Sequence, residues 1–136
     1  SGKRVVSPET SEKVLELMRL VVQEGKSRQA RVAGITLMGK TGTSNNRKAH
    51  GPGYQKKDVR ASFVGVFPSK ARYMVFITLD SPKATKKTYG FNNAGWNAAP
   101  VAGRIVKRLA PMMGIVPQFE PGVEGQPLVR QVTLRR

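Results

Sequence analysis

Six consecutive residues, Gly39-Lys40-Thr41-Gly42-Thr43-Ser44, carry the side chains of this sequence that could do chemistry together. They place one ammonium, three hydroxyls and two glycines directly after the run Ile35-Thr36-Leu37-Met38. Glycine lets a ligand approach backbone N–H groups closely, and a lysine with neighbouring hydroxyls adds positive charge and hydrogen-bond donors. The segment therefore predicts a binding site for an anionic group.

One motif that fits these letters is the P-loop of nucleotide-binding proteins, which Gly34 to Thr41 matches in full, with Asp80 as a candidate magnesium ligand. A P-loop needs an apolar strand before its first glycine, whereas residues 29–33 are largely polar or small. It also needs a helix after its lysine, and Gly42 and Asn45 disfavour one. Nucleotide binding therefore stays open as the weaker alternative.

The other motif is the Lys-Thr-Gly element of serine acyl-transferases that react with β-lactams, which Lys40-Thr41-Gly42 matches. In those proteins the element lies on a strand, and residues 35–44 suit a strand. A strand edge of this composition offers a backbone N–H to an oxyanion, hydroxyls to a carboxylate, and an ammonium that raises the local potential. Three letters also occur by chance, so the motif alone does not decide between the two.

Composition narrows the class of protein. The chain has 136 residues, of which 39% are hydrophobic, and this suits a single domain with a modest core. Its formal net charge of +16 favours anionic partners such as nucleic acid, anionic lipid or an anionic wall polymer. The basic residues are not interleaved with stacking aromatics, which single-strand binders use. A basic nucleic-acid-binding module is therefore a further, weaker alternative.

The sequence favours neither a metal nor a cofactor. It holds no cysteine and one histidine, His50, in a loop rich in glycine and basic residues. A disulfide framework is excluded, and a zinc site is not expected. No apolar run approaches the roughly 20 residues that a membrane-spanning helix needs, and no targeting segment is recognisable before the first expected helix.

The first expected element is a helix that begins at Pro8, because Ser7 can cap it and proline suits the first helical position. Gly25 should end it. Apolar residues that recur at helical spacing are expected to form its buried face: Val14, Leu17, Met18, Val21 and Val22.

Three strands are expected, over residues 34–44, 61–67 and 72–80. A mobile, glycine-rich loop over 45–59 should join the first two, and the turn at 68–71 should join the last two. So short a turn permits an antiparallel hairpin, whereas a parallel crossover needs a dozen or more residues. The sheet is therefore expected to be antiparallel.

A second helix is expected after Asn97, which can cap it, and Pro111 should stop it. Its expected buried stripe consists of Val101, Ile105 and Leu109, with Ala102 and Val106 beside them. Residues 118–136 should form an irregular, basic, Pro/Gly-rich tail, to which 128–132 could add an edge strand. The fold class expected is α+β, with a three-stranded antiparallel sheet flanked by helices.

Further segments match one known family in order and spacing: Leu20-Val21-Val22 with Glu24-Gly25, Ser62-Phe63-Val64-Gly65-Val66-Phe67-Pro68, Tyr89-Gly90-Phe91, Ala94-Gly95-Trp96 and Ala98-Ala99-Pro100-Val101. With them, the chain closely resembles the C-terminal part of the transpeptidase domain of class B penicillin-binding proteins, particularly the division-specific type. The resemblance covers about Val5 to Pro117. It implies that residues 1–117 are part of a serine β-lactamase/D,D-peptidase-like transpeptidase fold.

The resemblance also implies a reaction. These enzymes cross-link peptidoglycan. A serine attacks the penultimate D-alanine carbonyl of a stem peptide, releases the terminal D-alanine and passes the acyl group to a neighbouring amine. β-Lactams acylate the same serine. By resemblance, Lys40 would hydrogen-bond the family's Ser-x-Asn serine and help proton transfer. Thr41 and Thr43, with Gly42 between them, would bind the substrate or antibiotic carboxylate. The Thr43 N–H would also be an oxyanion donor.

One departure from the family is severe, because no serine of this chain has a lysine three residues later. Ser44-Asn45-Asn46 matches Ser-x-Asn in letters but lies directly after the Lys-Thr-Gly element, so we assign it no role. The chain alone should therefore be inactive and, with a sheet edge and apolar faces uncovered, only marginally stable.

The partners implied follow from the same resemblance. They are the remaining N-terminal part of the transpeptidase domain, peptidoglycan stem peptides, β-lactam antibiotics and, for the full-length parent, divisome proteins, with no nucleic acid and no cofactor. The expected location is the periplasmic side of a bacterial inner membrane, with the parent anchored by an N-terminal transmembrane helix that this sequence does not contain.

Overall fold

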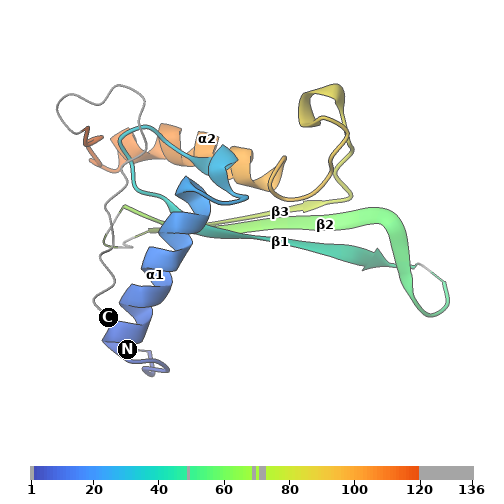
Figure 1. Ribbon diagram of the computed structural model, residues 1–136, viewed down its shortest axis with the longest axis horizontal. Helices are drawn as coiled ribbons and strands as arrows, with labels where there is room; N and C mark the ends of the chain where they lie inside the picture. Colours follow the sequence, from blue (N-terminus) through green and yellow to red (C-terminus); the bar gives the residue numbers. More distant parts are fainter. Residues whose placement is uncertain (1, 49, 69, 71–72, 120–136) are drawn as a thin grey trace.

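The computed structural model describes residues 2–48, 50–68, 70 and 73–119. Its elements, in chain order, are α1 (Pro8–Gln23), the 3-10 turn η1 (Arg28–Ala30), β1 (Met38–Arg47), β2 (Tyr54–Phe67), β3 (Tyr73–Asp80), the 3-10 turn η2 (Lys86–Thr88) and α2 (Ala98–Met112). The strands form one antiparallel sheet in the order β1-β2-β3 (Figure 1). The predicted antiparallel α+β arrangement is confirmed. The edge strand expected at 128–132 lies outside the described residues.

Helix α1 begins where the sequence predicts. The Ser7 hydroxyl oxygen accepts a hydrogen bond from the Thr10 N–H at 3.2 Å, and Pro8 occupies the first helical position. This bond satisfies one of the backbone donors that a helix start leaves without a partner. At the other end, the Glu24 N–H bonds to the Leu20 carbonyl at 2.7 Å, so the helix finishes just before the expected Gly25.

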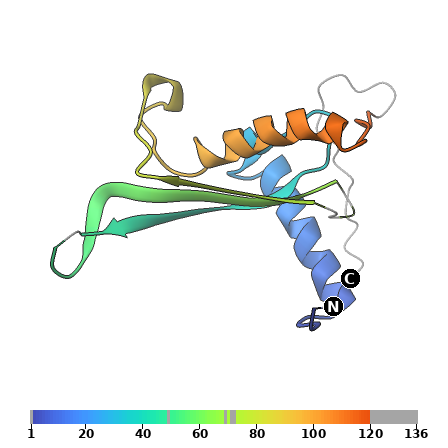
Figure 2. The same ribbon diagram turned by 180° about the vertical axis from the view of Figure 1, so that it is seen from behind.

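The predicted buried face of α1 is confirmed toward its C-terminal end, where Met18 and Val21 are half-buried, and is wrong toward its start. Val22 is the buried residue of this helix, whereas Val14 and Leu17 are 48% and 62% exposed. The C-terminal end of α1 lies against the sheet, and its N-terminal half extends past the sheet on the side away from α2 (Figures 1 and 2). The described part of the chain therefore leaves this apolar stripe largely uncovered.

The β1–β2 hairpin is longer than predicted. β1 begins at Met38 rather than at residue 34, because Gly34 has a φ of +73° and a bridge between Val32 and Ile35 closes a tight turn there. The loop expected over 45–59 is also wrong: pairing continues to Arg47 and resumes at Tyr54. Cross-strand pairing thus overrides the loop preference of the local glycine and asparagine residues.

The core lies between the sheet and α2. Three residues of β2, Ala61, Phe63 and Phe67, point into it and are buried. The helix contributes mainly small residues: Ala98, Ala99, Ala102, Gly103, Val106 and Ala110. Figure 2 shows α2 lying along the sheet on this side.

The predicted stripe of α2 is therefore correct at Ala102 and Val106, only partly correct at Val101 and Ile105, and wrong at Leu109. Val101 and Ile105 are half-buried, and Leu109 is 39% exposed. The reason is close packing: a Cβ added at Gly103 would lie 2.8 Å from the Ala30 carbonyl oxygen of η1. Large side chains cannot fit at so short a distance, so they lie at the flanks of the contact.

The end of α2 also differs slightly from expectation. Pro111 lies inside the last turn, and the helix ends one residue later, at Met112. Beyond it the chain returns toward the core, where the Gln118 N–H donates to the Gly34 carbonyl at 2.8 Å. Residues up to 118 are thus held against the turn that precedes β1.

Candidate functional site: the Lys-Thr-Gly strand

The Lys-Thr-Gly segment lies on β1, at one edge of the sheet. Within the described residues, β1 pairs with β2 alone, so its outer edge faces no other strand. An edge strand presents a row of backbone N–H and C=O groups that are free to bind an extended ligand. The predicted position of the motif on a strand is borne out by this arrangement.

The side chains of the motif divide between the two faces of the sheet. Thr41 and Thr43 are opposite Phe63 and Ala61 of β2, which are buried on the α2 side. Lys40 therefore lies on the other face, because successive side chains of a strand alternate. The ammonium and the hydroxyls flank the free edge of β1 from opposite sides. A ligand that uses both must lie along that edge.

Lys40 is exposed and belongs to no ion pair recorded among the described residues. Its Nζ donates to the carbonyl oxygen of the neighbouring Thr41 at 2.8 Å. An ammonium has three donors, and a single carbonyl leaves two of them for other groups. The charge is thus available to an anion or to a hydroxyl brought to this face.

The two glycines of the motif have different surroundings. A Cβ added at Gly39 would lie 2.7 Å from the Val64 carbonyl oxygen and would overlap the ring of Phe63. A Cβ added at Gly42 would meet nothing within 4 Å. Gly39 is therefore required by packing, whereas Gly42 leaves open space beside the strand for a ligand.

Thr43 has a partner that the sequence did not indicate. Its Oγ1 accepts a hydrogen bond from the Ala94 N–H at 3.1 Å, although the two residues are 51 positions apart. Ala94 belongs to the segment that leads from β3 into α2. The sequence singles out Ala94-Gly95-Trp96 only through the family resemblance. No local sequence pattern predicts its contact with Thr43.

Ser44-Asn45-Asn46 has a structural explanation. Asn46 Nδ2 donates to Asp80 Oδ1 at 2.9 Å and to Ser81 Oγ at 3.2 Å, which ties the end of β1 to the end of β3 across the sheet. Ser44 is exposed on the strand. The Asn46 contacts thus give this segment a structural role across the sheet.

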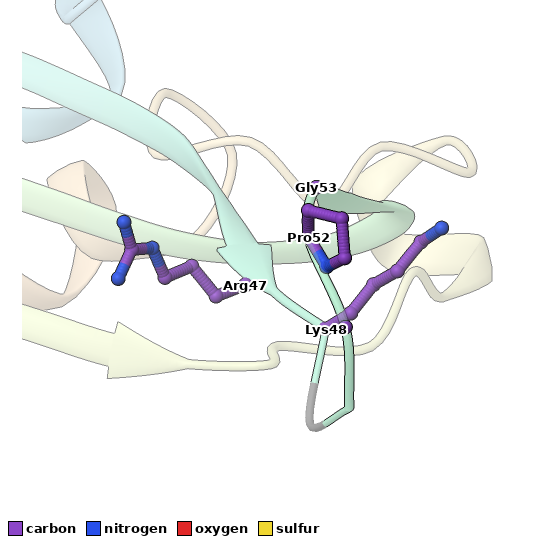
Figure 3. A pocket seen from close by; sticks show the side chains of 5 residues that line it. Arg47, Lys48, Pro52 and Gly53 are labelled. Carbon is purple, nitrogen blue, oxygen red and sulfur yellow. The ribbon is translucent and has the colours of Figure 1, made fainter.

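The tip of the β1–β2 hairpin contains a shallow hollow of about 340 Å³, lined by Arg47, Lys48, Gly51, Pro52 and Gly53. Figure 3 shows the Arg47 and Lys48 side chains pointing away from one another. Because the two charges diverge, the hollow does not form a converging anion site. It adds nothing to the candidate site on β1.

No group of three or more His, Cys, Asp or Glu side chains within the described residues is placed to hold a metal ion. None of the helices in the described part of the chain is long and apolar enough to cross a membrane.

Comparison with known proteins decides the family. Residues 1–107 match the penicillin-binding protein transpeptidase domain. The chain belongs to this family. It corresponds to a part of the transpeptidase domain of a class B penicillin-binding protein, as the resemblance implied.

Two curated relatives of this transpeptidase segment illustrate its place in the family. It is 38% identical over 122 residues to the probable peptidoglycan D,D-transpeptidase FtsI of Caulobacter vibrioides, covering 84% of this chain and 21% of the relative. It is 33% identical over 117 residues to stage V sporulation protein D of Bacillus subtilis, covering 85% and 17%. The chain thus spans about a fifth of the length of these proteins.

Solved structures confirm the fold of the transpeptidase segment. The apo transpeptidase domain of Burkholderia pseudomallei penicillin-binding protein 3 superposes with a TM-score of 0.73 at 33% identity, covering 88% of this chain and 34% of that one. Penicillin-binding protein 3 of Mycobacterium tuberculosis, solved with ampicillin, gives 0.74 at 29% identity, covering 96% and 29%. The predicted penicillin-recognising transpeptidase fold is correct.

The nucleotide-binding alternative fails for this transpeptidase segment. Lys40 and Thr41 lie inside β1, and the next element is β2 rather than a helix. Asp80, the candidate magnesium ligand, accepts from Asn46 and lies 3.7 Å from the Arg60 guanidinium. A P-loop would need a helix N-terminus at the lysine to hold phosphates.

Proposed function

We propose that this chain is the part of a peptidoglycan D,D-transpeptidase that supplies the Lys-Thr-Gly strand. The whole enzyme would cross-link stem peptides during septal cell-wall synthesis and would be acylated by β-lactams. One observation carries the proposal: in a chain of this family, the Lys-Thr-Gly segment forms an edge strand with a free outer edge. An extended stem peptide fits such an edge by adding hydrogen bonds of strand type.

The residues of β1 would have different roles in the reaction. The Lys40 ammonium would hydrogen-bond the Ser-x-Asn serine and help proton transfer on its face of the sheet. The Thr41 and Thr43 hydroxyls would bind the carboxylate of the substrate or antibiotic, and Gly42, between them, leaves the Lys40 face of the strand open. The Thr43 N–H would stabilise the oxyanion, and such a donor typically contributes about 10²–10³ in rate.

The nucleophile must come from another part of the parent enzyme, because this sequence contains no Ser-x-x-Lys. The remaining N-terminal part of the transpeptidase domain would supply it, so this chain alone would be inactive. The full parent would work at the periplasmic side of the bacterial inner membrane, held by an N-terminal anchor, with divisome proteins as partners and no nucleic acid.

Labelling with a fluorescent penicillin tests the proposal. The chain is joined to, or mixed with, the remaining part of the domain, and the labelled band is measured on a gel. We expect a covalent label that Lys40→Ala lowers by about two orders of magnitude. Lys48→Ala, which removes another exposed lysine, at the hairpin tip, is the matched control and should label normally. Labelling of the isolated 136-residue chain would refute the assignment of the nucleophile to the missing part.

A further inference from the structure

The turn Asn93–Trp96, which precedes α2, connects the candidate site to that helix. Within it, the Trp96 N–H donates to the Asn93 carbonyl at 3.1 Å. Ala94 is buried and bonds in two directions: its N–H donates to Thr43 Oγ1 at 3.1 Å, and its carbonyl accepts from the Ala99 N–H at 2.9 Å. One residue thus joins the Lys-Thr-Gly strand to the first turn of α2.

Asn97 holds this turn in place with both ends of its amide. Its Oδ1 accepts from the Ala98 N–H at 2.7 Å and so caps α2. Its Nδ2 donates to the Asn92 carbonyl at 2.9 Å, at the start of the turn. One partner is a donor and the other an acceptor, so together they fix which way the amide points.

The backbone of the Asn93–Trp96 turn also packs against the segment that follows α1. A Cβ added at Gly95 would lie 2.9 Å from the Lys26 carbonyl oxygen, so the backbone of the turn lies close to the segment that follows α1. The Gly95 N–H donates to Asn93 Oδ1 at 3.1 Å. These contacts leave the turn little freedom to withdraw from β1 while its hydrogen bonds persist.

The bond from Ala94 determines what the Thr43 hydroxyl can do. A backbone N–H can only donate, so Thr43 Oγ1 is the acceptor in this pair. The hydroxyl hydrogen is not used by that bond, and the exposed side chain can turn it toward a ligand. A hydroxyl held in this way presents a donor, which suits a carboxylate.

We propose that Asn97 is a positioning residue for Thr43. By holding the Asn93–Trp96 turn, it keeps the Ala94 N–H on Thr43 Oγ1, so that the hydroxyl donates to the carboxylate of a bound stem peptide or β-lactam. The identity of that ligand rests on the proposed function, whereas the hydrogen-bond chain from Asn97 to Thr43 does not.

Two substitutions separate this role from helix capping. Asn97→Ser keeps a neutral capping oxygen but loses the amide group that reaches Asn92. Asn97→Asp keeps the length and the capping oxygen but cannot donate at neutral pH. The matched control is Ser7→Ala, which removes the cap of α1, a helix that makes no recorded bond to Thr43 or Ala94.

The first measurement is amide hydrogen exchange of Ala94 in the chain joined to the remaining part of the domain. We expect faster Ala94 exchange, by about three- to tenfold, in Asn97→Ser, Asn97→Asp and Thr43→Val, as one lost hydrogen bond predicts. Ser7→Ala should leave it within about twofold. The Phe63 amide of β2 reports whether the fold survives. Unchanged Ala94 exchange in both Asn97 variants would overturn the proposal.

The second measurement compares acylation by a fluorescent penicillin with acylation by its methyl ester, which lacks the carboxylate. Both Asn97 variants should slow acylation by the acid about three- to tenfold and leave the ester within about twofold. Equal slowing of both ligands would show a general structural effect and overturn the positioning role. If the unaltered protein takes no label at all, the proposed function fails, and hydrogen exchange still decides the link from Asn97 to Thr43.

Discussion

The two faces of the sheet differ in how completely this chain covers them. On the α2 side, Phe63 is fully buried beneath a helix of small residues. On the other face, Phe76 and Met74 of β3 are 63% and 70% exposed. β3 is apolar on both faces, which is typical of a strand covered on both sides. Within the described residues, one face of the sheet is therefore covered and the other is open, and we expect a further part of the domain to cover the open face.

The candidate site lies where the two sides meet. Thr43 belongs to the covered side, where the Asn93–Trp96 turn holds its hydroxyl, and Lys40 belongs to the uncovered face. A remaining part of the domain that covers the open face would also be placed to bring its Ser-x-Asn serine to Lys40. The two regions would then contribute different halves of one site.

The largest expected effect comes from truncating one phenylalanine on each face. Phe63→Ala should lower the free energy of unfolding by about 3–5 kcal/mol, because the ring is buried. Phe76→Ala should change it by less than about 1 kcal/mol. Urea unfolding followed by circular dichroism measures both. Equal losses would show that the open face is already covered, for example by a second copy.

Charges placed on the open side test what covers it. Leu17→Asp and Phe76→Asp should change the unfolding free energy of the chain by less than about 1 kcal/mol, since both side chains are exposed. Each should weaken association with the remaining part of the domain by about tenfold or more, because a buried unpaired charge is costly. Titration calorimetry measures the association. Wild-type affinity in both variants would place the partner surface elsewhere.

Two glycine substitutions compare the closely packed α2 side with the open surroundings of β1. Gly103→Ala should destabilise the chain by about 1–3 kcal/mol, because the new methyl group would meet the Ala30 carbonyl. Gly42→Ala, in open space on β1, should cost nothing or add up to about 1 kcal/mol of stability. Thermal unfolding of both variants provides the comparison. Destabilisation by Gly42→Ala would mean that its surroundings are filled.

The smallest expected effect on stability is the pH dependence that Glu9 contributes at the start of α1. A hydrogen bond from the Ser7 side chain, and one from the backbone N–H of Glu9 itself, lower the pKa of the Glu9 carboxyl. Its contribution to stability is therefore present above the ordinary pKa of a glutamate and is lost as the pH falls through the lowered value. Ser7→Ala should raise the Glu9 pKa toward its usual range, as an NMR titration would show. An unchanged pKa would assign the shift to the helix backbone alone.

The sequence predicted those features that depend on local chemistry. Ser7 and Pro8 located the start of α1, Asn97 located the cap of α2, and the short turn after Phe67 required antiparallel strands. The α2 stripe was only partly predicted because hydrophobicity favours Leu109, whereas close packing against η1 requires Gly103.

The candidate site, like the fold, was predicted only in part. The positions of Lys40 and Thr43 on a strand followed from the motif. The partner of Thr43 did not, because a hydrogen bond between residues 51 positions apart depends on how α2 is laid on the sheet. Likewise, the hairpin extended past its expected end because pairing with β2, a tertiary effect, outweighed the composition of residues 45–47.

Two glycines that face one another, Gly39 and Gly65, determine the register of β1 and β2. Gly39 and Gly65 are directly opposite one another, and the ring of Phe63 occupies the space that a side chain on either would need. A slip of one residue between β1 and β2 would send every side chain of β1 to the other face, exchanging the positions of Lys40 and Thr43. It would also bring Lys40 or Met38 over that ring, where no side chain fits. Steric exclusion at this pair of glycines, of which Gly39 directly precedes Lys40, thus determines on which face of the sheet each group of the site lies.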